Sequence, residues 1–367
     1  MEQKDINKFG RPANRKNRNV LTVIFLCLVS LMALSFCIVI LLNNAQLKRE
    51  NEAINSELST IKDQEYYTQT QVTQMVNNAQ TTATDDEKNR ILNQIQTSLE
   101  DGNGTNQTFR DLFTDKLVVT DSGHYYFVDI NDAITKSPFL STDFALAEDG
   151  FMRYVGTNEN VSAVAARGID VSKHNGEIDW KKVADSGITY AIIRVGVRGY
   201  TEGKIAADEQ FENNIKGATA NGIAVGVYFY SQAINEDEAY EEAKFVLDAI
   251  EPYNVTYPVV FDIEKSESSD ARTKDLTTAE NTAIARKFCD TVSGAGYTPM
   301  IYGNIYTFAV MLDLTQFSDI DTWIAYYNTP QYYPYNFSIW QYSSTGTVDG
   351  ISDKVDLNIS LKDWTAK

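Results

Sequence analysis

Eight short apolar runs between residues 168 and 358 constrain the fold of this chain most strongly. The runs cover 168–172, 190–197, 223–231, 257–264, 298–303, 322–327, 337–343 and 354–358. Amphipathic stretches with helical spacing separate the earlier runs, at 178–186, 207–221, 236–250 and 277–294. Strands that alternate with helices predict parallel pairing through crossover connections.

The helical stretches fade after residue 313, and the last three runs follow one another directly. Five strand–helix units and then three strands predict an α/β fold, a TIM-like eight-stranded barrel whose helical ring is incomplete. An open doubly wound sheet is the alternative. Such a sheet usually carries a Gly-rich phosphate loop after its first strand, and no such loop follows residue 172.

Four carboxylates stand at the ends of three of these runs: Asp170, Asp262, Glu264 and Asp356. Barrels of this class place their active sites at the C-terminal ends of the strands. Residues two apart on a strand point the same way, so Asp262 and Glu264 face one mouth. Crowding two carboxylates in a partly buried site raises the pKa of one of them, which can then serve as a general acid.

Protonating a leaving oxygen is the recurrent need in glycoside hydrolysis. The alternative is structural: Asp262 and Glu264 would cap their strand and pair with Lys265 or Arg194. The spacing of the two acids is compatible with a retaining, an inverting or a substrate-assisted reaction, so it leaves the stereochemistry open.

Aromatic and amide side chains surround the acids, and they are candidates for sugar binding because aromatic planes pack on the apolar faces of sugar rings. Any one of these aromatics could equally be ordinary barrel filling. The candidate substrate-binding residues are Tyr228, Tyr230, Tyr302, Tyr326, Trp340 and Gln341.

At these residues the chain resembles the family 25 glycoside hydrolases, the Chalaropsis-type lysozymes or N-acetylmuramidases. The resemblance covers about residues 167–364. It rests on Gly168–Ser172 with Asp179-Trp180, Gly226–Tyr230, Phe261–Glu264, Trp323–Tyr326, Trp340–Tyr342 and Val355–Asn358, in this order.

The resemblance implies an irregular (β/α)5(β)3 barrel over residues 167–367. It also implies cleavage of the β-1,4 bond between N-acetylmuramic acid and N-acetylglucosamine in peptidoglycan. Glu264 matches the family's general acid, and Asp262 matches the carboxylate that stabilises the developing cation or orients the substrate acetamido group. Asp170 and Asp356 match two further acids at the mouth.

Two rival functions remain open: hydrolysis of another N-acetylated glycan such as chitin, and a catalytically silent wall-binding scaffold. Peptidoglycan glycan strands are the expected partner. The formal charge of −18 disfavours nucleic acid. We expect no cofactor and no metal, since the chain has only two histidines, His124 and His174.

Residues 20–42 are free of charge and follow a 1–19 arm with six basic and two acidic side chains. A run of this length is enough for a helix to cross a bilayer, and the basic arm predicts a cytoplasmic N-terminus. We therefore expect a single-pass anchor, with the remainder outside the cell membrane and facing the wall. A cleaved signal peptide is the alternative, although its apolar region would be shorter.

Residues 43–108 are polar and carry two short stretches of helical spacing, which predicts a helical stalk that is a candidate for self-association. Residues 109–166 contain strand-like runs around Asp121-Ser122-Gly123 and predict a small β-rich linker region, in which we identify no catalytic chemistry. Of the three cysteines, only Cys289 lies beyond the anchor, so no disulfide can form within that part.

Overall fold

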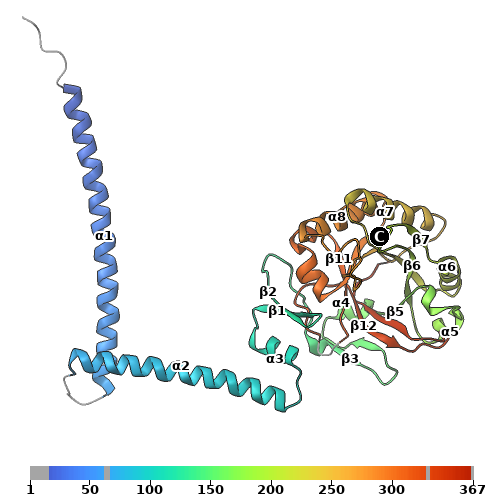
Figure 1. The fold of residues 1–367 in the computed structure, drawn as a ribbon, viewed down its shortest axis with the longest axis horizontal. Coiled ribbons are helices and arrows are strands. Elements are labelled where there is room, and N and C mark those ends of the chain that lie inside the picture. The colour runs from blue at the N-terminus through green and yellow to red at the C-terminus, as the bar shows by residue number, and fades with distance from the viewer. Residues whose placement is uncertain (1–15, 62–66, 328–330, 365–367) are drawn as a thin grey trace, which may run out of the picture. The chain divides into compact units, whose positions relative to one another are not determined.

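The computed structural model describes residues 16–61, 67–327 and 331–364. By its internal contacts the chain divides into one unit that ends at Asn93 and a second that begins at Gln94. Figure 1 shows the elements of both units. Residues 1–15, which hold most of the expected cytoplasmic arm, lie outside the described residues.

The first unit is helical. Helix α1 (Lys16–Ile61) contains the whole expected anchor, and its segment Val23–Ser56 is long and apolar enough to cross a membrane, by length and composition. Helix α2 (Gln69–Glu100) buries none of its residues and leads into the second unit. Residues Asn103 and Gly104 lie between α2 and helix α3 (Thr105–Leu112).

Eight strands in the second unit close into a barrel, in the spatial order β5-β13-β12-β11-β10-β9-β8-β6, and β6 pairs back with β5. Strand β13 is antiparallel to both neighbours, while the other pairs in the barrel are parallel. The bounds are β5 Ala166–Val171, β6 Tyr190–Arg198, β8 Ala224–Tyr230, β9 Val259–Asp262, β10 Pro299–Asn304, β11 Asp321–Ala325, β12 Ile339–Gly346 and β13 Val355–Ser360.

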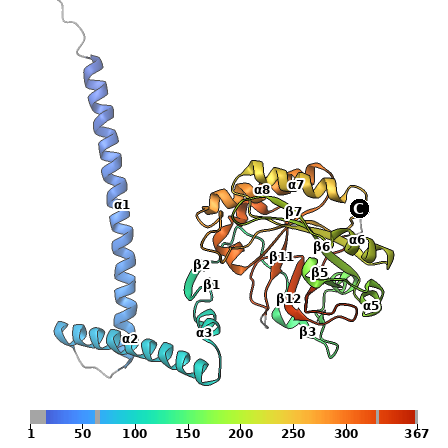
Figure 2. The same cartoon turned by 45° about the vertical axis from the view of Figure 1, so that its right-hand side comes forward.

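Helices cover only part of the barrel, which confirms the predicted α/β fold with an incomplete ring. The helices are α5 (Trp180–Asp185), α6 (Phe211–Ala220), α7 (Glu236–Ile250) and α8 (Thr278–Gly294). Helices α7 and α8 lie side by side (Figure 2). Between β10 and β11, where every residue is described, the chain forms a π-helical turn at Thr307–Met311 and a 3-10 turn at Leu314–Phe317. Strand β7 (Ile205–Ala207) extends the sheet beyond β6.

Alternation along the strands separates an inner core from an outer one. The barrel interior is filled by side chains such as Tyr190, Met300 and Trp323, while Ile169, Phe261 and Trp340 pack in the outer core. This period of two follows from strand geometry. It decides which strand residues can reach the mouth of the barrel.

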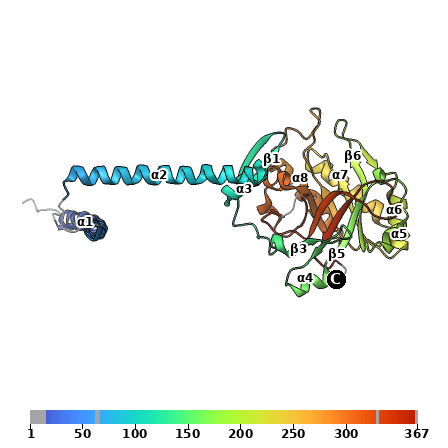
Figure 3. The same ribbon diagram turned by 90° about the horizontal axis from the view of Figure 1, so that it is seen from below.

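Residues 105–164 lie against the part of the barrel that lacks helices (Figure 3). Strands β1 (Lys116–Asp121) and β2 (His124–Asp129) form a hairpin, and β3 (Phe144–Leu146) pairs with β4 (Met152–Tyr154). Phe144 packs on Trp340 of β12 with ring centroids 5.1 Å apart. A 3-10 turn at Ser141–Asp143 and helix α4 (Glu159–Val164) complete the segment.

Candidate active site

A polar pocket opens at the mouth of the barrel and brings together all four carboxylates predicted from the sequence. Each of the strands β5, β8, β10, β11, β12 and β13 contributes one residue, while Asp262 ends β9 and Glu264 follows it. The lining residues are Asp170, Tyr228, Asp262, Glu264, Tyr302, Trp323, Tyr327, Gln341 and Asp356.

Asp170 is held by amide groups from two neighbouring strands. Gln341 Nε2 and Asn358 Nδ2 each donate to Asp170 Oδ2 at 2.8 Å. Trp323 Nε1 in turn donates to Asn358 Oδ1 at 2.8 Å. Asp356 pairs directly opposite Asp170 in the β13–β5 register. This buried network fixes the floor of the pocket before any substrate arrives.

The two cations that could have neutralised the acids are engaged elsewhere. Lys265 forms an ion pair with Asp121 of the β1–β2 hairpin. Arg194 Nε lies 2.7 Å from Asp208 Oδ2. The structural alternative for Asp262 and Glu264, pairing with these cations, is therefore not what the fold builds.

The carboxyl groups hold protons more tightly than they would in water. Burial raises the pKa of Glu264, and the negative charge of Asp356 raises it further. Burial also raises the pKa of Asp356, to about 6. The pKa values of Asp170 and Asp262 are raised for the same reason, with added repulsion from neighbouring acids. Such a site can keep a carboxylic acid protonated near neutral pH.

Asp262 also has an unused acceptor. The side chain is only 5% exposed, and its Oδ1 atom has no hydrogen-bond partner within the part of the chain that the structure describes. A buried acceptor without a donor costs free energy. A ligand N–H group could satisfy it.

Five of the six predicted sugar-binding residues fall into three groups. Tyr228, Tyr302 and Gln341 line the pocket, and Tyr302 Oη donates to Gln341 Oε1 at 2.8 Å. Tyr230 pairs in register with Asp262, beside the acids. Tyr326 lines a neighbouring groove instead.

Trp340 does not line the pocket. Its side chain is 1% exposed and belongs to the outer core, because neighbouring residues on β12 alternate and Gln341 takes the inward position. Its Nε1 atom donates to the Tyr326 carbonyl at 2.7 Å. The expectation that Trp340 stands among the pocket residues is corrected by this geometry.

Three residues of the site were not among the predicted ones: Trp323, Tyr327 and Asn358. Asn358 lies two residues after Asp356, so the period of two that linked Asp262 to Glu264 could have identified it. Trp323 is an inward position on β11 by the same rule. Tyr327 follows β11, and its Oη donates to Gln341 Oε1 at 2.7 Å, which strand periodicity does not predict.

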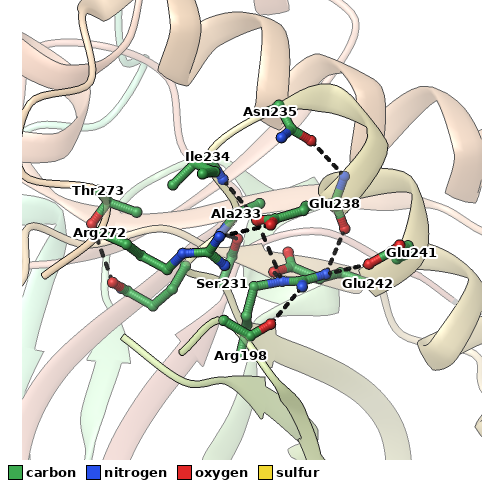
Figure 4. Close-up of polar contacts among 12 residues, drawn as sticks. Arg198, Ser231, Ala233, Ile234, Asn235, Glu238, Glu241, Glu242, Arg272 and Thr273 are labelled. Carbon is green, nitrogen blue, oxygen red and sulfur yellow. Dashed lines mark hydrogen bonds and ion pairs between the residues drawn. The ribbon is translucent and has the colours of Figure 1, made fainter. Parts of the chain in front are cut away.

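A second polar cluster, which we call the Arg198 network, ties the ends of β6 and β8 to α7 and the loop after β9 (Figure 4). Arg198 Nε lies 2.7 Å from Glu242 Oε1, and Arg272 Nη2 lies 2.7 Å from Glu238 Oε1. This loop follows Glu264 in the sequence, so the network anchors the segment of chain that comes after the candidate acid.

Among the described residues no group of three or more His, Cys, Asp or Glu side chains is arranged to hold a metal ion. The pocket instead combines acids, tyrosines and amides. Carboxylic acids gathered with tyrosines and an amide at the mouth of a barrel are the arrangement expected of a glycoside hydrolase.

Comparison with known proteins agrees with that class. Residues 169–351 match the model of glycosyl hydrolases family 25. The chain therefore belongs to this family through that domain, and the predicted family is confirmed.

Individual relatives match half of the chain or more. The chain is 30% identical to Lysozyme M1 of Streptomyces globisporus, over 52% of this chain and 66% of the relative. It is 28% identical to the uncharacterized protein YegX of Escherichia coli strain K12, over 52% and 68%. The modular autolysin LytC from Streptococcus pneumoniae aligns with a TM-score of 0.49 and 27% identity, over 66% of this chain and 57% of LytC.

Proposed function

We propose that this protein is a muramidase that cleaves the β-1,4 bond between N-acetylmuramic acid and N-acetylglucosamine in peptidoglycan. The observation that carries the proposal is the pocket in which four carboxyl groups meet with no arginine or lysine among its lining residues. The family match and the lysozyme among the relatives support the substrate class.

Glu264 is the general acid in this proposal. Its raised pKa keeps a proton available, which passes to the glycosidic oxygen as the bond breaks. The buried phenols of Tyr228 and Tyr302 remain donors, because burial raises their pKa values well above the usual range. Asp170, held by Gln341 and Asn358, and Asp356 support the charge balance of the site.

Asp262 would receive the N–H group of the substrate's 2-acetamido substituent. The free Oδ1 atom of Asp262 supports this role. The acetamido carbonyl could then attack the anomeric carbon, as in substrate-assisted glycosidases. We predict net retention of configuration without a covalent glycosyl-enzyme. Proton NMR of the first-formed anomer, together with a fluorosugar trapping attempt, checks this, and an inverted product or a trapped ester on Asp262 would contradict it.

The substrate class is tested by incubating the full chain with purified peptidoglycan and, separately, with chitin. Release of soluble fragments from peptidoglycan alone is the expected result. Release from chitin at a comparable rate would favour the rival glycan. No release from either, by a folded protein, would favour the wall-binding scaffold.

We further propose that α1 anchors the enzyme in the cell membrane, with the N-terminus inside and the barrel facing the wall. The apolar segment Val23–Ser56 supports an anchor. Protease added to cells stripped of their wall should remove the barrel and leave the N-terminal arm protected. A mature chain that begins near residue 44 would instead establish a cleaved signal.

A further inference from the structure

A second hollow adjoins the catalytic pocket, and we call it the hairpin groove. Glu264 and Tyr327 line both hollows, so the two hollows meet at the proposed acid. The barrel side of the groove includes Asn304, Tyr306 and Tyr326. Its other side comes from outside the barrel, from α3 and β1, and includes Asn106, Arg110, Thr120 and Asp121.

Specific contacts hold this appended wall in place. Asp121 forms an ion pair with Lys265, the residue after Glu264. The ring of Tyr126 packs edge-on against Tyr306 at 5.4 Å. Tyr332 Oη donates to the carbonyl of Lys116 at 2.7 Å. The wall is therefore a fixed part of the mouth, next to the point where the glycosidic bond would lie.

Arg110 brings an unneutralised positive charge to the hairpin groove. Its Nη1 atom donates to Tyr326 Oη at 2.8 Å, and its guanidinium lies 4.4 Å from the centre of the Tyr332 ring. Its Nε atom is buried without an acceptor, and no ion pair joins Arg110 to a carboxylate among the described residues. The acids that line the groove are Asp121, which Lys265 neutralises, and Glu264, the proposed general acid.

A substrate carboxylate fits this arrangement. Guanidinium groups recognise carboxylates through charge-assisted hydrogen bonds. Muramyl residues carry such groups and plain chitin does not. The carboxylate belongs to the lactyl ether where no peptide is attached, and to the stem peptide where one is attached.

We propose that Arg110 binds a carboxylate carried by a muramyl residue of the bound glycan strand, so that the segment before the barrel selects muramyl substrates. The inference rests on the proposed muramidase function and assigns part of its specificity to residues outside the barrel. Asn106 and Thr120, joined by a hydrogen bond of 2.7 Å, would offer polar contacts to the same residue.

The test measures binding, so that it stands apart from turnover. Full-length Glu264→Gln protein, with and without Arg110→Gln, is titrated by calorimetry with three tetrasaccharides. These are a muramyl glycan with stem peptides, the same glycan without peptides, and chitotetraose. Arg110→Gln should weaken binding of at least one muramyl ligand by about 10-fold or more, and change chitotetraose binding less than about two-fold.

Which ligand is affected identifies the source of the carboxylate. Loss with the peptide-bearing glycan alone indicates the stem, and loss with the peptide-free glycan alone indicates the lactyl group. Lys116→Gln is the matched control, since Lys116 lies on the same segment but pairs with Asp129. It should leave all three affinities unchanged.

Arg110→Lys keeps the positive charge, so it should retain the preference for muramyl ligands. This result would show that Arg110→Gln weakens binding through lost recognition and not through a folding defect. Equal weakening of all three ligands by Arg110→Gln, or no weakening of either muramyl ligand, would overturn the proposal. A protein without muramidase activity that still shows the Arg110-dependent preference would overturn the proposed function and leave this inference standing.

Discussion

Carboxyl groups are buried in two regions of the barrel, the catalytic pocket and the Arg198 network, and the two regions treat them differently. In the Arg198 network, Arg198 is 4% exposed and bonds Glu242, Glu241 and two backbone carbonyls. In the pocket, the acids meet tyrosines and amides instead of cations. Arginine makes one cluster a brace for the loops, whereas the acids of the other lie close enough together to raise one another's pKa values.

The comparison also distinguishes how substitutions in the two regions change the stability of the fold. Removing one partner of a buried ion pair leaves a charge uncompensated and destabilises the fold. Removing one of several crowded acids relieves repulsion. Substitutions in the Arg198 network should therefore reduce stability, and those in the pocket should reduce activity.

The largest expected effect is on catalysis. Glu264→Gln keeps the shape of the side chain but removes the titrating proton, so the rate of peptidoglycan hydrolysis should fall by about 10²–10⁴-fold. The thermal midpoint should stay at or above that of the wild type. Near wild-type turnover by the folded variant would move the acid elsewhere.

Arg198→Met tests the other side of the comparison. Because Glu242 is fully buried, loss of its partner should lower the free energy of unfolding by about 3 kcal/mol. Burial already raises the pKa of Glu242 to about 7, opposed by Arg198. A raised pKa gives stability that is lost as pH rises, so the deficit should be deeper at pH 8 than at pH 5.

Glu241→Gln is the matched control for that measurement, made by denaturant unfolding. Glu241 contacts the same arginine but is 63% exposed, so its loss should cost less than about 1 kcal/mol. Equal losses in the two variants would mean that burial does not decide the strength of this network.

A smaller effect concerns the pH dependence of kcat/KM. The negative charge of Asp356 helps burial to raise the pKa of Glu264. Asp356→Asn should lower that pKa, so the acid loses its proton earlier and the basic limb of the profile moves to lower pH. Asp353→Asn, an exposed neighbour in sequence, should leave the limb in place. A shift toward higher pH would contradict the assigned coupling.

The smallest expected effect is on the hydrogen bonds that orient Gln341. Tyr327→Phe removes the 2.7 Å bond to Gln341 Oε1, while Tyr302 still donates to the same atom. One neutral hydrogen bond corresponds to about a 2–10-fold loss in kcat/KM. A loss as large as that of Glu264→Gln would give Tyr327 a direct role in the chemistry.

The barrel strands and the four acids could be predicted from the sequence because both follow short periods along the chain. The expected run at 236–250 is α7 itself, and Asp356, near the start of the antiparallel strand β13, lies opposite Asp170, near the end of β5. Neighbouring residues of a strand face opposite ways, so only one of Trp340 and Gln341 could line the pocket, and the sequence does not show which one. In the structure Trp340 packs outward on Phe144, almost 200 residues earlier in the chain, at a face that has no helix.

The hairpin groove could not be predicted from the sequence either. Its two walls come from residues more than 140 positions apart, such as Asp121 and Glu264. Local patterns carry no signal for a contact of that range. The linker region in which the sequence indicated no chemistry therefore supplies one wall beside Glu264.

The most direct test of the account identifies the new reducing ends after the full chain digests purified peptidoglycan. Borohydride reduction followed by mass spectrometry distinguishes muramic-acid ends from N-acetylglucosamine ends. The account predicts reduced N-acetylmuramic acid at the ends of the wild-type fragments and almost none with Glu264→Gln. Reduced N-acetylglucosamine at those ends, or equal release by both proteins, would contradict it.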